Sequence, residues 1–311
     1  METPWIDAWI RWERDSKEVV AEDEDEDEEQ GEPLPPTEQF SFSYQLPGNN
    51  DDIVLELKGF PSESEQIWNS TGLTLWPCSH YLCEYLLEHH ATLLQPPPPS
   101  QETCTESSQQ PPQQQVVLEL GSGLGRCGLL AYHLLLLRNN KTADECHCST
   151  HVYLTDGDTD TLKQLRDNVQ HNTKQPANKH TNNDTTTIST NTTISCHQLL
   201  WGTETTKEFC QAHKNVILTD DSDNNQGSNN IRLVLGSDLI YVPQVIQPLF
   251  ETVKVLLSHT HDNDNTAARF LMAHSNRRQG SSVTLEMVLE GATNAGLSHE
   301  IVMESPPQEG I

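Results

Sequence analysis

The feature that most constrains the fold is a short apolar segment that runs directly into a cluster of glycines. Val116–Leu120 has the length and composition of a buried strand. It is followed at once by Gly121-Ser-Gly-Leu-Gly-Arg-Cys-Gly128, and Leu124–Arg138 then has the apolar content of a helix. A glycine-rich turn in this position lets a ligand approach the backbone closely and points helix N–H groups at it. The glycines predict a ligand but do not identify it, because dinucleotide enzymes and methyltransferases share them.

The pattern of a strand followed by a helix is repeated along the chain. Further strands are expected at His151–Thr155, Ile194–Leu200, Ile231–Leu235, Ala268–Ala273 and Ile301–Met303. Further helices are expected at Thr74–His90, Asp160–Asn172, Val245–Leu257 and Ser281–Ala295, the last with Gly296 just after its C-cap. Such alternation is typical of an α/β fold in which a parallel sheet is covered by helices on both faces. We predict a doubly wound sheet.

Polar segments interrupt this alternation and set the expected domain boundaries. The hydrophobic content is only 34%, and the deficit is concentrated in a few stretches of the chain. Such stretches cannot bury enough apolar surface to offset the entropy of ordering them. We expect an acidic, largely disordered segment at 1–38, a β-hairpin extension at 39–69 and an α/β domain at 70–311. Disordered insertions in that domain are expected near 95–115, 172–193 and 203–230.

The net charge of −28 limits the partners that the chain can bind. A strongly negative surface repels phosphate backbones, which argues against nucleic acid, and favours basic partners such as a protein that presents a lysine. A purely solubilising role for the charge is an equally open interpretation. The longest apolar run, Leu129–Leu137, is too short to cross a membrane, so no membrane role is expected.

The eight cysteines form no regular framework, and no signal peptide is expected at Met1. We therefore expect reduced thiols and a cytoplasmic location, with the nucleus as a second compartment. Cys146-His147-Cys148 together with His151 has the wrong spacing for the usual zinc ligands, so no metal site is predicted.

Candidate binding residues fall at the predicted ends of the strands, where doubly wound sheets bind their ligands. Glu119 lies on an otherwise apolar strand, and a carboxylate there is costly unless a cation satisfies it. The amino group and sulfonium of S-adenosylmethionine would do so. Asp156 is placed to accept both ribose hydroxyls of such a cofactor. Trp201 could stack on adenine or serve as a core aromatic, and the sequence leaves both roles open.

Asp238 and Tyr241 close the predicted strand at Ile231–Leu235. A carboxylate and an aromatic ring at this edge could orient an amine and stabilise the charge that develops as it attacks a methyl group. Methyl transfer is an in-line displacement that needs an aligned, neutral nucleophile more than acid–base chemistry. The alternative is that Asp238 caps the helix that follows, which would leave Tyr241 without a role.

Six sequence segments, taken together and in order, resemble the seven-β-strand methyltransferases of family 16, the lysine methyltransferase-like group. They are Gly72-Leu-Thr-Leu-Trp76-Pro, Val117-Leu-Glu-Leu-Gly-Ser-Gly-Leu-Gly125, Leu154-Thr-Asp156, Leu165-Arg-Asp-Asn-Val169, Leu200-Trp201-Gly202 and Ser237-Asp238-Leu-Ile-Tyr241. The resemblance covers about residues 70–303. It implies a Rossmann-like, mostly parallel sheet of seven strands with a reversed last strand.

The resemblance also implies roles for individual residues. It places S-adenosylmethionine among Trp76, Gly121, Gly123, Asp156 and Trp201, with Glu119, Gly125 and Asp238 completing the expected cofactor site. It places Asp238 and Tyr241 beside the target lysine as the catalytic residues.

The expected activity is therefore protein-lysine N-methylation dependent on S-adenosyl-L-methionine, carried out by a monomer. Known members of the family act on translation factors, chaperones and calmodulin, and the sequence does not choose among these substrates. Three other functions stay open: methylation of a histidine or another amine, a non-catalytic cofactor-binding module, and a nicotinamide-dependent oxidoreductase. Glu119 and the absence of an obvious proton donor disfavour the last of these.

Overall fold

The computed structural model describes residues 36–46, 52–95, 114–141, 148–174, 191–218, 230–258, 268–275 and 283–303. Most of the acidic segment predicted at 1–38 lies outside these ranges. So do residues 96–113, 175–190 and 219–229, which make up much of the three insertions predicted to be disordered. The expectations for those residues stay predictions.

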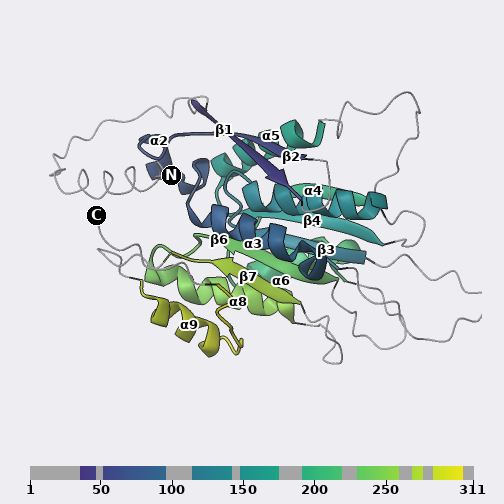
Figure 1. The fold of residues 1–311 in the computed structure, drawn as a ribbon. Helices are drawn as coiled ribbons and strands as arrows, with labels where there is room; N and C mark the ends of the chain where they lie inside the picture. The colour runs from purple at the N-terminus through teal and green to yellow at the C-terminus, as the bar shows by residue number, and fades with distance from the viewer. Residues whose placement is uncertain are drawn as a thin grey trace, which may run out of the picture.

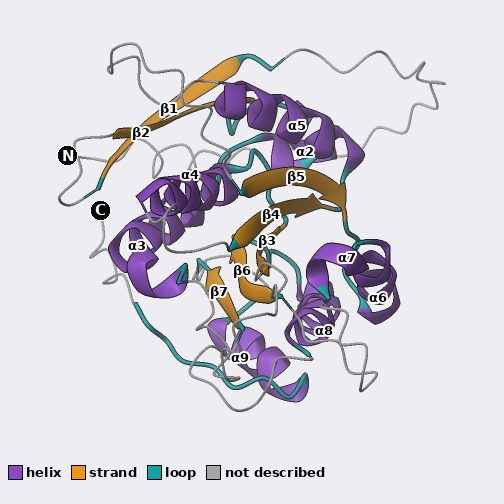
Figure 2. Cartoon of the chain, turned by 90° about the vertical axis from the view of Figure 1, so that its right-hand side faces the viewer, coloured by secondary structure: helices purple, strands orange, loops and turns teal. Residues whose placement is uncertain are grey.

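The strands of the main sheet all run parallel. In spatial order they are β5 (Thr192–Gln198), β4 (Ser149–Asp156), β3 (Gln114–Leu120), β6 (Ile231–Ser237) and β7 (Arg269–Ala273). Successive strands add outward on one side from β3 to β5, and the chain then crosses to β6 on the other side of β3 (Figure 2). This change of direction is the switch point of a doubly wound sheet, where ligands bind beyond the carboxyl ends of the strands. The predicted α/β fold is confirmed.

Helices cover both faces of this sheet (Figure 1). One face carries α3 (Cys78–Leu93), α4 (Arg126–Lys141) and α5 (Thr159–Lys174). The other face carries α6 (Thr203–Ala212), α7 (Lys214–Ile217), α8 (Ile246–Leu257) and α9 (Leu285–Asn294). The short elements α2 (Gln66–Asn69), η1 (Thr71–Leu73) and η2 (Pro243–Val245) lie in the connections. No described helix is long and apolar enough to span a bilayer.

The alternation of side chains along β3 divides the core between the two faces. Val116, Leu118 and Leu120 belong to the cluster under α8, whereas Val117 belongs to the cluster under α3, α4 and α5. Because side chains in a strand alternate with a period of two, Glu119 shares the face of Val117 and lies beneath α4. The strand thus places one carboxylate below the start of the helix that follows the glycine turn.

The N-terminal hairpin forms a further layer over α4 and α5. Its strands β1 (Glu38–Gln45) and β2 (Asp52–Gly59) pair antiparallel along their whole length, which confirms the predicted hairpin. Inward-facing side chains of the hairpin, among them Leu55 and Leu57, are fully buried in the same core cluster as α4 and α5. The hairpin is therefore part of the packed domain.

Three expectations are corrected. We expected seven strands in the main sheet, but its described part has five, and the separate hairpin brings the total to seven. Ile301–Met303, expected as the reversed last strand, is not paired and has about half of each side chain exposed. Its composition suits a strand, but a strand also needs a neighbour to pair with. The insertion predicted at 203–230 begins with the helices α6 and α7, whose few apolar residues are buried against α8.

Candidate functional site

The turn between β3 and α4 adopts a backbone that only glycine accepts easily. Gly121, Gly123 and Gly125 have φ values of 54°, 53° and 89°. These angles lie in the left-handed region, where a Cβ atom is unfavourable. Gly128 is needed for a different reason, since a Cβ at that position would come within 2.0 Å of Leu154 Cδ2. The predicted turn is thus confirmed as a backbone feature.

Glu119 is buried directly beneath this turn, with 2% of its surface exposed. Its Oε2 atom accepts a hydrogen bond of 3.1 Å from the Gly128 N–H in the first turn of α4. Burial raises the pKa of Glu119 to about 8, and the nearby Cys83 contributes to the rise. The carboxyl group therefore holds a proton at neutral pH and would ionise readily beside a cation.

Asp156 ends β4 and holds the same turn from the side. Its Oδ2 atom accepts from the Gly123 N–H at 3.1 Å, and its Oδ1 atom accepts from the Asp158 N–H at 3.0 Å. Burial raises its pKa, against the effect of these hydrogen bonds. Asp158, not Asp156, caps α5, since its Oδ1 atom accepts from the Thr161 N–H at 2.7 Å. Asp156 is thus free of helix capping and faces the ligand edge.

A small cavity of about 30 Å³ opens between the glycine turn and the start of α3. Its walls come from Glu119, Gly121–Leu124, Arg126, Cys127 and Ser237 on one side and from Thr74–Trp76 and Ser79 on the other. Trp76 belongs to this wall, and its Nε1 atom donates to the Thr71 carbonyl at 2.8 Å. The structure therefore brings Trp76, Gly121 and Gly123, which the resemblance implied, together with Glu119, whereas Gly125 does not line this cavity. The cavity can hold a small polar group and not a whole nucleoside.

Trp201 lies at the neighbouring strand end, after β5. A Cβ built on Gly121 would be 3.5 Å from its Cζ2 atom, so the indole ring flanks the glycine turn. Trp201 is half-buried and also packs against the core cluster on the α8 face. Trp201 is therefore a core aromatic and also lies beside the carboxyl edge of the sheet, so the two roles that the sequence left open are compatible.

Asp238 follows β6 and has a strained backbone. Its φ of 52° makes it the one non-glycine residue with a positive φ in the described part of the chain. Its Oδ2 atom accepts from the Cys78 N–H at 2.9 Å, and its own N–H donates to the Ala273 carbonyl at 3.1 Å. Asp238 therefore caps α3, which lies 160 residues earlier, and not the helix that follows it.

Tyr241 lies on the surface near the end of β6, with 47% of its area exposed. It does not contribute to the wall of the small cavity. Leu200 and Val242, which follow β5 and precede α8, are also exposed apolar residues. Of the two residues predicted to be catalytic, Asp238 is thus half-buried, whereas the ring of Tyr241 is accessible from solvent.

Arg126 is a site residue that the sequence analysis missed. It starts α4 and lines the cavity, yet only 7% of its surface is exposed. Its Nε atom donates to the Tyr44 hydroxyl at 2.9 Å, and its Cζ atom lies 3.7 Å from the centre of the Phe42 ring. None of the ion pairs among the described residues includes it. The one feature of the sequence that could have identified Arg126 is that it is a single arginine at the start of an otherwise apolar helix.

The structure does not test the prediction that Cys146, His147, Cys148 and His151 form no metal site. Cys146 and His147 lie outside the described residues, and no group of three or more potential ligands gathers within the described ranges. No disulfide joins the described cysteines, and Cys83 and Cys127 approach to 3.7 Å between their sulfur atoms beside Arg126.

Comparison with known proteins bears on this arrangement. A family model described as lysine methyltransferase matches residues 62–290, which is most of the chain. Among solved structures, that of the DszA carbon methyltransferase is similar over 73% of this chain, with 11% sequence identity and a TM-score of 0.33. This chain covers 42% of that protein, less than half of its length. No curated protein matches the chain.

Proposed function

Because the chain belongs to the lysine methyltransferase family, we propose that it transfers the methyl group of S-adenosylmethionine to a lysine of another protein. One observation carries this proposal. The turn at the switch point has three left-handed glycines, a buried carboxyl group beneath it and a second carboxylate beside it. This combination suits a ligand that has both a cationic end and a ribose.

The lining of the small cavity suits the amino-acid end of the cofactor. Glu119 contributes a carboxyl group to its lining and Arg126 a cation, and an α-amino acid carries an ammonium and a carboxylate on one carbon. An ammonium beside Glu119 would offset the burial that raises the pKa of this carboxyl group to about 8. Arg126, a buried cation outside the described ion pairs, is suited to the carboxylate.

The open edge of the sheet fits the nucleoside end. The Asp156 carboxylate accepts from the backbone N–H groups of Gly123 and Asp158, and Gly157 contributes a further backbone hydrogen bond. Because a carboxylate offers about four acceptor positions, one is left for a ribose hydroxyl. The indole of Trp201, beside Gly121, supports adenine by stacking.

The acceptor lysine reaches this edge from the surface. S-adenosylmethionine supplies, when bound, a methyl group on a sulfonium that is displaced in line. The residues of this chain then have to hold and orient an amine. Asp238 attracts the lysine as a cation, and the exposed Tyr241 ring contributes a cation–π contact. The ammonium releases one proton to solvent before its nitrogen attacks, and the thioether S-adenosylhomocysteine leaves as the methyl group is transferred. The net charge of −28 favours a basic protein surface.

Translation factors, chaperones and calmodulin are the candidate substrates, in the cytoplasm or nucleus, and we propose that the protein acts as a monomer.

The first test is calorimetry with S-adenosylhomocysteine and, in parallel, with NAD. We expect binding of S-adenosylhomocysteine alone. Binding of NAD alone would overturn the proposal in favour of an oxidoreductase.

The second test measures tritium transfer from labelled S-adenosylmethionine into proteins of a cell lysate, followed by amino-acid analysis. We expect labelled methyl-lysine with the parent protein and little label with Asp238→Asn. Asparagine retains the hydrogen-bond acceptor and tolerates a positive φ, so this variant removes mainly the charge. Labelled methyl-histidine would change the substrate class. Cofactor binding without any transfer would identify a non-catalytic module.

A further inference from the structure

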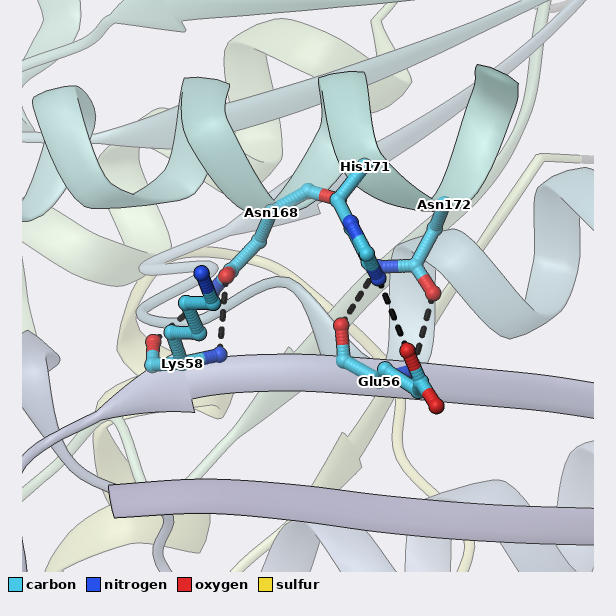
Figure 3. A network of polar contacts seen from close by, with 5 residues as sticks. All are labelled: Glu56, Lys58, Asn168, His171 and Asn172. Carbon is cyan, nitrogen blue, oxygen red and sulfur yellow. Dashed lines mark hydrogen bonds and ion pairs between the residues drawn. The ribbon is translucent and has the colours of Figure 1, made fainter. Parts of the chain in front are cut away.

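Asn168, on α5, lies between the N-terminal hairpin and the glycine turn. Its Oδ1 atom accepts from the Lys58 N–H at 2.9 Å, and its Nδ2 atom donates to the Lys58 carbonyl at 3.1 Å (Figure 3). The same Nδ2 atom donates to the Leu124 carbonyl at 3.1 Å, and Gln164 Nε2 donates to Oδ1 at 3.2 Å. An asparagine amide has two donors and two acceptor positions, so all four are used.

The pairing with the hairpin follows from matched spacings. Asn172, one turn further along α5, pairs in the same way with the N–H and the carbonyl of Glu56 (Figure 3). Four residues of helix advance about 6 Å, and two residues of strand advance about 6.6 Å. Two asparagines spaced by four therefore meet two β2 residues spaced by two. The side chains act as a neighbouring strand for the outer edge of β2.

Only Asn168 extends this pairing to the proposed cofactor site. Leu124, whose carbonyl it binds, lies between two left-handed glycines, Gly123 and Gly125. The Leu124 side chain also reaches the hairpin, since a Cβ on Gly59 would come within 2.5 Å of its Cδ1 atom. A glycine-rich backbone has more conformational freedom than any other. Contacts from neighbouring residues are therefore needed to hold the turn in the one conformation that binds a ligand. The Asn168 amide is buried and positioned to impose it.

We propose that Asn168 is a positioning residue that holds the glycine turn in the conformation that binds S-adenosylmethionine, and that it couples cofactor affinity to docking of the N-terminal hairpin. The inference rests on the proposed function. It goes beyond it by giving the hairpin, which does not line the cavity, a part in cofactor binding. A role in hairpin attachment alone is the competing explanation.

Asn172 provides a matched control for this competing explanation. Its Nδ2 atom donates to the Glu56 carbonyl at 2.8 Å and to the Asn168 carbonyl at 2.7 Å, so it helps to attach the hairpin without touching the turn. The substitutions Asn168→Asp and Asn172→Asp make the same chemical change on the same helix. Each removes two donors and leaves the accepting oxygen in place.

The test compares these variants with the parent protein for S-adenosylhomocysteine affinity by calorimetry, thermal unfolding, and amide exchange in a peptide that covers 121–128. We expect both variants to lower Tm. Asn168→Asp should also weaken binding about tenfold or more, the effect of leaving one buried carbonyl without its donor. Exchange in the turn should rise with Asn168→Asp and stay near the parent rate with Asn172→Asp.

Equal affinities for the two variants, or exchange that rises equally in both, would overturn the inference. If Asn168→Asp does not fold, Asn168→Ser is compared with Asn172→Ser, since a serine hydroxyl ends at the position of the amide carbon and falls short of the Leu124 carbonyl. If the parent protein does not bind S-adenosylhomocysteine, the proposed function fails. The exchange measurement then still shows whether Asn168 holds the turn.

Discussion

The ends of β3 and β6 lie side by side at the carboxyl edge of the sheet, and the chain turns there with nearly the same backbone angle. Leu120 pairs with Gly236, and each strand is followed by a residue with positive φ. After β3 that residue is Gly121, at 54°, and after β6 it is Asp238, at 52°. Glycine adopts this angle freely, whereas a residue with a Cβ atom loses about 1–2 kcal/mol.

The difference indicates what each turn contributes. The turn after β3 needs an accessible backbone, so side chains are absent from three positions. The turn after β6 keeps a side chain at an energetic cost, and the surrounding structure holds it through Cys78 and Ala273. Strained residues of this kind concentrate at functional sites. We therefore infer that β3 presents backbone to the cofactor and that β6 presents a carboxylate to the acceptor.

The largest expected effect comes from removing the Asp238 carboxylate. Asp238→Gly should relieve the strained backbone while losing the bond to Cys78, so the free energy of unfolding should change by less than about 1 kcal/mol. Methyl transfer should fall about a hundredfold, as it does when a preorganised charge is lost from an active site. Denaturant unfolding and initial transfer rates measure the two quantities. Retained activity would show that the Asp238 carboxylate is not needed for methyl transfer and that the turn after β6, like the turn after β3, contributes only its backbone.

The next effect comes from adding a side chain to the turn after β3. In Gly123→Ala the new Cβ would lie 3.2 Å from the Gly72 carbonyl oxygen at a φ of 53°. We expect a loss of about 2 kcal/mol in stability and at least about tenfold weaker binding of S-adenosylhomocysteine. Gly157→Ala, just after β4, is the control, since its Cβ would meet the movable end of Leu200 at 3.3 Å and the Leu199 carbonyl oxygen at an ordinary contact distance of 3.9 Å. Similar behaviour of the two variants would contradict a special role for the turn.

A third effect tests the carboxyl group below the turn. The pKa of Glu119 is raised to about 8, so the free folded protein holds a proton that the unfolded chain releases near pH 4.5. Stability of the free protein should therefore fall as pH rises from about 4.5 to 8. An ammonium ligand favours the ionised form, so affinity should rise about tenfold from pH 6 to pH 7.

Glu119→Gln should remove both pH dependences. It should make the free protein more stable at pH 8 than the parent and should weaken ligand binding. Calorimetry in two buffers of different ionisation enthalpy measures the released proton directly. Proton release that persists in Glu119→Gln would assign the titration to another group.

The smallest effect is expected at the exposed rim. Tyr241→Phe retains the ring and should leave transfer nearly unchanged. Tyr241→Leu should lower kcat/KM for a protein substrate about threefold, the size of one exposed cation–π contact. Affinity for S-adenosylhomocysteine should be the same in both variants, because Tyr241 does not line the cavity. A lower cofactor affinity would move Tyr241 into the cofactor site.

Much of the fold follows from local patterns in the sequence. The apolar run of β3, the glycines after it and the hairpin strands all occur where periodicity and turn composition predict them. Gly296, expected after the C-cap of the last helix, has a φ of 82° behind Ala295. The rule that parallel strands end together predicts that Asp156, Trp201 and Asp238 lie at one edge with the glycine turn. Each of these inferences depends on residues close in sequence or on a general property of parallel sheets.

The sequence by itself determined the parallel α/β domain, its hairpin and the edge of the sheet to which the ligand site is assigned in our proposal, because propensity and periodicity act over a few residues. Only the tertiary structure decided which side chains meet there. Arg126 lies 82 residues from Tyr44, and Asp238 lies 160 residues from the helix that it caps. It also decided that Ile301–Met303 stays unpaired and that residues 203–217 are helical. Burial and partners come from distant segments, and no local pattern encodes them.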